Sequence, residues 1–152
     1  MKRRAPRRAA GRPATVEIGY EFGFDAAHRF TGVPRGHKYR GVHGHSFRVE
    51  VALRGAPRPP HGFVADLEQV ERACRGLQRR LDHKLLNEIK YLNNPSLENI
   101  ALWIWRRLAV KFPGLARVTV RRDSLGQSAT YFGPADKSRE KSTGKRWKYV
   151  ER

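Results

Sequence analysis

The sequence predicts a single α+β domain whose elements follow the order β-β-α-α-β-β. Two segments near the N-terminus alternate apolar and polar residues, two in the middle repeat apolar residues at helical spacing, and two shorter alternating segments follow. The length of 152 residues and the hydrophobic content of 39% suit one domain with a core of its own.

The first two strands are predicted in "VEIGYEFGF" with the following "DAAHRF", and in "HSFRVEVALRG". On a strand, every second side chain lies on the same face. The first strand places on one face Ile18, Tyr20, Phe22, Phe24, Ala26 and His28. The second places on one face His43, His45, Phe47, Val49, Val51 and Leu53. The Gly- and Pro-containing segment "TGVPRGHKYRG" separates them as a loop, and "GAPRPPHG" ends the second strand.

Two helices and two further strands complete the domain. The first helix is predicted to begin after Asp66 as N-cap and to run for about four turns, with apolar residues at helical spacing: Leu67, Val70, Ala73, Cys74, Leu77 and Leu81. The second is predicted in "PSLENIALWIWRRLAVKF", with Ser96 as N-cap and its end at Pro113 and Gly114. The last strands are predicted in "ARVTVRR" and "QSATYFG".

The net charge of +18 is concentrated at the two ends of the chain. Residues 1–14 carry six Lys/Arg and no acidic residue, and residues 134–152 carry seven basic and three acidic residues. Both are expected to be disordered tails that flank a domain at 15–133. The tails can bind nucleic acid or another polyanion through phosphate contacts, but no nucleic-acid motif supports this as the main role.

The remaining composition indicates a cytoplasmic protein. The single cysteine, Cys74, excludes an internal disulfide, and its place on the apolar stripe of the first helix indicates a core residue. No apolar run approaches the roughly 20 residues that span a bilayer, so no membrane association is expected. The N-terminus lacks the apolar region of a secretory signal.

Three histidines share the apolar face of the predicted sheet. His43 and His45 stand two residues apart on one strand, and His28 has the same parity on the other. An isolated His-x-His pair is more often structural, but a third imidazole on the same face favours a metal site. Neutral imidazoles suit Zn²⁺, and three protein ligands with an open fourth position are typical of catalytic zinc.

Candidates for proton transfer are fewer. Asp82 and His83 are adjacent just after the first helix, where the carboxylate can orient the imidazole, although an isolated pair of this kind is more often a cap or a surface feature. No Gly-x-Ser-x-Gly elbow and no phosphate-binding Gly-rich loop is present.

The motifs "FDAAHRF", "HKYRGVHGHSF", "GFVADLEQV", "LDHKLLNE", "NPSLENIALWIW" and "YFG" resemble, in this order, the 6-pyruvoyltetrahydropterin and 6-carboxytetrahydropterin synthase family. The resemblance covers about residues 17–133. It implies the tunnelling fold, a four-stranded antiparallel sheet with two helices on one face. It also implies a homohexamer built as a dimer of trimers, with small-molecule sites at subunit interfaces.

The resemblance also implies roles for individual residues. It places the zinc ligands at His28, His43 and His45 and the catalytic pair at Asp82 and His83. The substrate-binding positions fall on Ser96, Glu98 and Asp123, although counting forward along the third strand gives Arg122 in place of Asp123.

Three departures from the family pattern affect the substrate or the chemistry. The catalytic cysteine position holds Tyr39, the anchoring glutamate is replaced by Asp123 or Arg122, and Leu97 stands where a hydroxyl residue is usual. Tyrosine can transfer protons, but its ordinary pKa of about 10 makes it a weaker base than a thiolate unless a cation lowers that pKa.

These observations favour a zinc-dependent lyase or cyclase with an altered active site, acting on a reduced pterin or a related oxygenated metabolite. Two alternatives remain open. One is a non-catalytic member of the family that binds a ligand or supports assembly, and the other is a polyanion-binding protein that uses its basic tails.

Overall fold

The computed structural model describes residues 14–134 and confirms the predicted order of elements. In chain order these are β1 (Val16–His28), β2 (His43–Gly55), α1 (Leu67–Leu81), α2 (Leu97–Leu108), β3 (Leu115–Arg122) and β4 (Gln127–Tyr131). Two short 3₁₀ helices, η1 (Leu86–Glu88) and η2 (Asp123–Leu125), are additional to the prediction. The tails predicted at 1–14 and 134–152 lie almost entirely outside the described residues.

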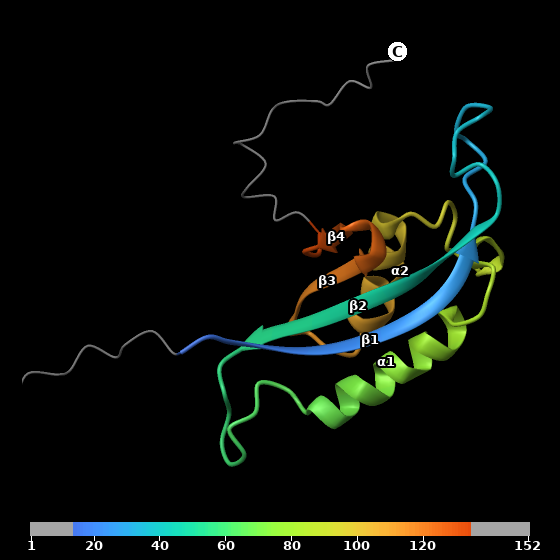
Figure 1. The fold of residues 1–152 in the computed structure, drawn as a ribbon. Coiled ribbons are helices and arrows are strands. Elements are labelled where there is room, and N and C mark those ends of the chain that lie inside the picture. Colours follow the sequence, from blue (N-terminus) through green and yellow to red (C-terminus); the bar gives the residue numbers. More distant parts are fainter. Residues whose placement is uncertain (1–13, 135–152) are drawn as a thin grey trace, which may run out of the picture.

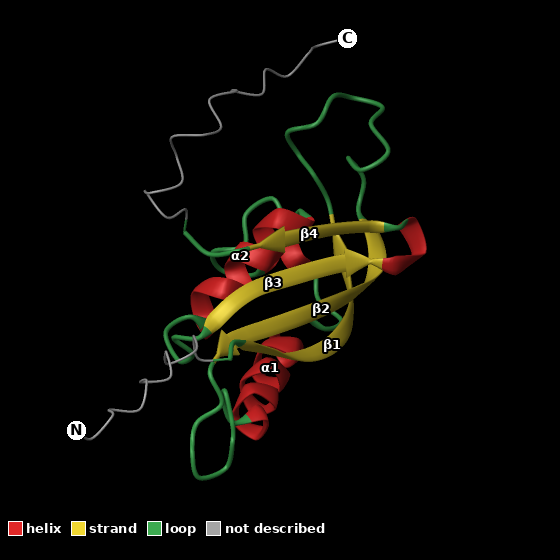
Figure 2. Ribbon diagram, turned by 90° about the vertical axis from the view of Figure 1, so that its left-hand side faces the viewer, coloured by secondary structure: helices red, strands yellow, loops and turns green. Residues whose placement is uncertain are grey.

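The strands form one antiparallel sheet in the order β1-β2-β3-β4, and both helices cover the same face of it. Helix α1 packs on β1, and α2 packs on β3 and β4 (Figures 1 and 2). The loop between β1 and β2 projects from one end of the sheet, and the loop between β2 and α1 from the other (Figure 1). The result is a two-layer α+β domain, as the sequence predicts.

The core lies between the sheet and the helices and follows the predicted alternation except at Ala52, where the pairing of β2 with β3 shifts register. The buried residues of the sheet are Phe22, Phe24, Ala26, Phe47, Val49, Val51, Ala52, Leu53, Leu115, Val118 and Val120. The helices contribute Val70, Cys74, Leu77, Leu81, Leu97, Ile100, Ala101, Trp103, Ile104 and Leu108. Burial raises the pKa of the Cys74 thiol to about 12, so this residue is an unreactive part of the core.

Both predicted N-caps are confirmed. Asp66 Oδ1 accepts a hydrogen bond from the Glu68 N–H at 2.9 Å, and Ser96 Oγ accepts one from the Asn99 N–H at 3.3 Å. Helix α2 ends at Leu108, earlier than the predicted end at Pro113. The chain turns there, because the N–H of Phe112 bonds the Leu108 carbonyl and the Phe112 side chain enters the core.

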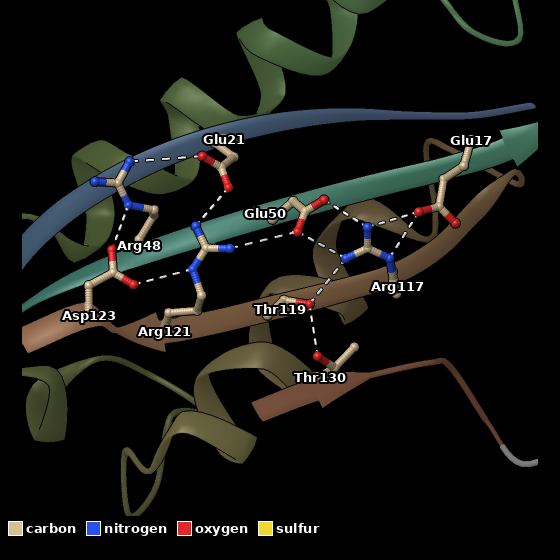
Figure 3. A network of polar contacts seen from close by, with 9 residues as sticks. All are labelled: Glu17, Glu21, Arg48, Glu50, Arg117, Thr119, Arg121, Asp123 and Thr130. Atoms are coloured by element: carbon tan, nitrogen blue, oxygen red, sulfur yellow. Dashed lines mark hydrogen bonds and ion pairs between the residues drawn. The ribbon is translucent and has the colours of Figure 1, made fainter. Parts of the chain in front are cut away.

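The other face of the sheet carries a network of ion pairs (Figure 3). Arg117 on β3 bonds Glu17 on β1 at 2.8 Å and Glu50 on β2 at 2.7 Å. Arg121 bonds Glu21 at 2.8 Å, so basic side chains of the third strand tie the first two strands together.

Within residues 14–134, the helices are too short or too polar to cross a bilayer.

Candidate metal centre

Strand pairing brings the three predicted histidines together at one end of β1 and β2. In the antiparallel register His28 lies opposite His43, and Ala26 lies opposite His45. The ring centroid of His28 is 4.6 Å from that of His43 and 5.2 Å from that of His45, and the centroids of His43 and His45 are 4.9 Å apart. One nitrogen from each ring lies within 4.8 Å of the others.

Backbone carbonyls fix the tautomers of two of these rings. His28 Nδ1 donates to the Pro95 carbonyl at 2.7 Å, and His43 Nδ1 donates to the Gly41 carbonyl at 2.8 Å, because a carbonyl can only accept. Each Nε2 therefore carries a lone pair, and both Nε2 atoms are buried without a hydrogen-bond partner. Buried unpaired acceptors that face one another are the donor set of a metal site.

The environment also favours the neutral form of two of the imidazoles, those of His28 and His45. Burial lowers the pKa of His28 to about 4, and burial followed by the charge of Arg122 lowers the pKa of His45. Neutral imidazole is the form that binds a metal ion. Three imidazole nitrogen donors, with no thiolate or carboxylate in the cluster, fit zinc with an open position.

Arg122, the last residue of β3, lies against this cluster. Its Nη1 donates to His45 Nε2 at 3.2 Å, and only 8% of its surface is exposed. Val118, Val120 and Arg122 share the helix-facing parity of β3, which explains why Arg122 points toward the histidines. If His45 held a metal ion through Nε2, the Arg122 guanidinium would have to release that atom.

Tyr39 also lies at the cluster, although it belongs to the loop between β1 and β2. Its ring stacks on that of His43, with centroids 5.3 Å apart and planes 21° apart. A backbone hydrogen bond of 3.0 Å from the Phe30 N–H to the Tyr39 carbonyl ties this part of the loop to the end of β1. Hydrogen bonds from Lys38 and then Gln127 lower the pKa of the Tyr39 phenol, and the charges of Lys38 and Arg122 add to this effect.

The Asp82–His83 pair is formed but lies apart from the three histidines. Asp82 Oδ2 is 3.0 Å from His83 Nδ1, and both residues bond the backbone of Asp25 on β1. The His83 side chain is 79% exposed. Among residues 14–134, no hydrogen bond or ring contact joins this pair to the histidine cluster.

The three predicted substrate-binding residues occupy different places. Ser96 caps α2 directly after Pro95, whose carbonyl holds His28, and Glu98 is exposed in the first turn of the helix. Asp123 bonds Arg48 at 2.8 Å and also pairs with Arg121 on the open face of the sheet (Figure 3). Arg122, rather than Asp123, therefore faces the histidine cluster.

Sequence reasoning alone missed the two carbonyls that orient the rings. Backbone acceptors such as those of Pro95 and Gly41 leave no residue-type signal, because every residue carries a carbonyl. The orientation of Arg122 did have a signal, namely its parity with Val118 and Val120.

Comparisons with known proteins agree on one family of pterin enzymes. The sequence profile described as "6-pyruvoyl tetrahydropterin synthase" matches residues 17–134. The dihydroneopterin monophosphate aldolase of Pyrococcus furiosus is 37% identical over 110 residues, which cover 72% of this chain and 88% of the aldolase. The 6-carboxy-5,6,7,8-tetrahydropterin synthase of Synechocystis is 35% identical over 120 residues, or 75% of this chain and 91% of that protein.

The fold is likewise shared with a solved structure. The 6-pyruvoyl tetrahydropterin synthase of Caenorhabditis elegans superposes with a TM-score of 0.72 over 81% of this chain and 99% of its own, at 24% sequence identity. This likeness confirms the tunnelling fold that the sequence motifs imply.

Proposed function

The chain belongs to the 6-pyruvoyl tetrahydropterin synthase family, whose relatives here are pterin synthases and a pterin aldolase, and we propose that it is a zinc-dependent lyase acting on a reduced pterin or a related oxygenated metabolite. The observation that carries this proposal is the pair of buried, unpartnered Nε2 atoms on His28 and His43, with His45 beside them.

In this proposal His28, His43 and His45 hold the ion through ring nitrogens. Zinc, when bound, acts as a Lewis acid that polarises the oxygens of the substrate side chain. The Pro95 and Gly41 carbonyls keep the rings oriented, since each accepts the Nδ1 proton of one ring.

Tyr39 is the residue we assign to proton transfer. Its ring lies on His43, and its lowered pKa increases the phenolate fraction at neutral pH relative to an ordinary tyrosine. In a retro-aldol cleavage the phenolate can take the proton of a side-chain hydroxyl while the adjacent carbon–carbon bond breaks. The deprotonated oxygen becomes a carbonyl oxygen, and the outer fragment leaves as an aldehyde. The electron pair stays on the carbon attached to the ring system, and the phenol then returns the proton to that carbon.

Carbon–carbon cleavage is the reaction we favour within the family. The relative that is 37% identical is named an aldolase, and a single residue that accepts and then returns one proton suffices for that reaction. Elimination or cyclisation, as expected of a synthase, is the second candidate, because another relative at 35% identity carries that name.

We further propose that the site is completed in a homo-oligomer, a hexamer built as a dimer of trimers. The Asp82–His83 pair is exposed at the edge of β1 and lacks a contact to its own histidine cluster within the described chain, which favours a role toward a second copy. Ser96 and Glu98 lie at the start of α2, next to Pro95, and are our candidates for substrate contacts.

Incubation of the zinc-loaded protein with the mono- and triphosphates of dihydroneopterin, followed by mass spectrometry, tests this function. We expect loss of the outer part of the side chain and a shortened pterin, and we expect His43→Ala to abolish it while His61→Ala, in an exposed loop, retains it. If folded, zinc-loaded protein converts neither compound, the proposed substrate class is wrong.

A further inference from the structure

Arg122 is a buried cation. Among residues 14–134 it is the one buried Lys or Arg, with 8% of its surface exposed. Its Nη1 bonds a neutral imidazole, that of His45, and its Nε is buried without any hydrogen-bond partner. A guanidinium stays charged under all ordinary conditions, so this positive charge is permanent.

The neighbouring arginine shows what Arg122 lacks. Arg121 points to the open face of the sheet and pairs with Glu21 at 2.8 Å and with Asp123 at 3.4 Å. Arg122 points to the opposite face and pairs with no carboxylate in the described part of the chain. Arg121 and Arg122 are consecutive residues with the same charge, but only Arg121 is paired with carboxylates.

An unpaired buried charge is costly unless an opposite charge joins it. The cost of the unpaired Arg122 charge is higher still if the neighbouring histidine cluster holds a divalent cation, as proposed. A guanidinium and a zinc ion side by side leave the site with excess positive charge, and an anion would offset it. The unpartnered Nε and the Nη1 that metal binding would free are the donors for such an anion.

We propose that Arg122 binds an oxyanion carried by the substrate, a phosphate or a carboxylate, beside the three histidines. The planar guanidinium matches both groups through two parallel hydrogen bonds. The ring of Tyr39, 5.6 Å from the guanidinium carbon, limits the position of the arginine from one side. This inference rests on the proposed function, and it narrows the substrate to a metabolite with an anionic side chain.

Binding of an oxyanion would account for an arginine at position 122, where the family resemblance implies a glutamate. The family resemblance implies a glutamate anchor near this end of β3, and a carboxylate there would accept hydrogen bonds from donors on the substrate. Arg122 reverses the polarity, because it can only donate. A substrate that fits Arg122 must therefore present acceptor oxygens at this point.

Calorimetric titration with inorganic phosphate, and separately with acetate, at constant chloride concentration tests the proposal on the full chain, both zinc-loaded and metal-free. We expect Arg122→Gln to weaken binding of at least one of these anions by about tenfold to a hundredfold, the usual worth of hydrogen bonds to a charged group. Arg121→Gln is the matched control, since it removes the same charge one residue away on the opposite face and should bind the anion as the parent does. Arg122→Lys keeps the charge without the fork and should lie between them; it also carries the test if Arg122→Gln does not fold.

The outcomes separate the two proposals. Preference for phosphate or for acetate identifies which oxyanion the site takes. Anion binding that depends on Arg122 in the metal-free protein supports the inference even if the protein fails to retain zinc. Equal binding by the parent, Arg121→Gln and Arg122→Gln would place the anion on the basic surface and overturn the inference, as would a parent protein that binds neither anion.

Discussion

Tyr39 stands at the position where the family resemblance implies a catalytic cysteine, so its role is the first to test. Removal of its hydroxyl in Tyr39→Phe preserves the ring that stacks on His43 while it removes the transferable proton. If Tyr39 transfers a proton, steady-state turnover of the dihydroneopterin phosphates should fall by roughly a hundredfold or more. Zinc content and thermal stability should stay at the level of the parent.

The dependence of this activity on pH gives a second check on Tyr39. Hydrogen bonds from Lys38 and Gln127 lower the pKa of the phenol, so the reactive phenolate should form below the ordinary pKa of 10. Turnover of the parent should rise with pH through that lowered pKa, and Tyr39→Phe should lose the rise. A variant that keeps both turnover and pH profile would reduce Tyr39 to a space-filling residue.

At the residue scale, the sequence predicted which histidines share a face of the sheet, but it did not predict which residue at the end of β3 points toward them. Strand parity was enough to place His28, His43 and His45 on one face, because β1 and β2 are regular up to their ends. It was not enough to choose between Arg122 and Asp123, since β3 ends there and η2 begins, and counting from either side of a turn gives different positions. The sequence raised the possibility that the Asp82–His83 pair is a cap or a surface feature, but its separation from the histidine cluster was beyond sequence reasoning, because it depends on how the chain after α1 follows β1.

At the scale of elements, the open face of the sheet depends on Arg117. This side chain is 25% exposed, and it bonds both Glu17 and Glu50 from a strand that lies two places from β1. Arg117→Gln should lower the free energy of unfolding by about 1.5–3 kcal/mol, the range for hydrogen bonds to charged groups, because it leaves a half-buried Glu50 without its main partner. Chemical denaturation measures this directly.

Arg72 on α1 provides the matched control for Arg117. It pairs with Glu68 one helical turn away, and both side chains are more than 70% exposed. Arg72→Gln should therefore change the stability by no more than about 0.5 kcal/mol. Equal effects of the two substitutions would show that the network adds nothing beyond ordinary surface pairs.

Acid should remove the contribution of Arg117. The hydrogen bond from Arg117 is the main cause that holds the pKa of Glu50 below its ordinary value of 4.5. A carboxylate whose pKa is lowered in the folded state contributes stability above its unfolded pKa and loses it as the pH falls through the folded value. The difference between the parent and Arg117→Gln should therefore be full at neutral pH and shrink below about pH 4.5.

The helix boundaries show that capping residues predict where a helix begins better than apolar periodicity predicts where it ends. Asp66 and Ser96 were correctly identified as N-caps, because their side chains accept bonds from the first turn of their own helix. The end of α2 was placed too late. The apolar spacing continues to Phe112, but that residue reaches the core through a turn rather than through a further helical turn.

At the scale of the whole molecule, the sheet ends in two open edges. The backbone of β1 is covered near Gly23 and Ala27 by Gln78 and Lys84, whereas the described residues supply no such cover for the outer edge of β4 or for β1 before Gly23. Unpaired strand edges favour pairing with another copy. Light scattering at micromolar concentration should give a mass several times that of the 17.5 kDa chain, a hexamer in our proposal. A monomeric mass would contradict the assembly and leave Asp82 and His83 without a partner site.

The zinc content of the purified protein tests the central claim most directly. Elemental analysis after dialysis without strong chelators should find one zinc ion per chain in the parent and in His61→Ala, whose histidine lies in the loop between β2 and α1. His28→Ala, His43→Ala and His45→Ala should each retain far less, because each removes one of the three nitrogen donors that lie within 4.8 Å of one another. Folded parent protein that retains no transition metal, or three variants that retain as much zinc as the parent, would contradict the assignment of these histidines as a metal centre.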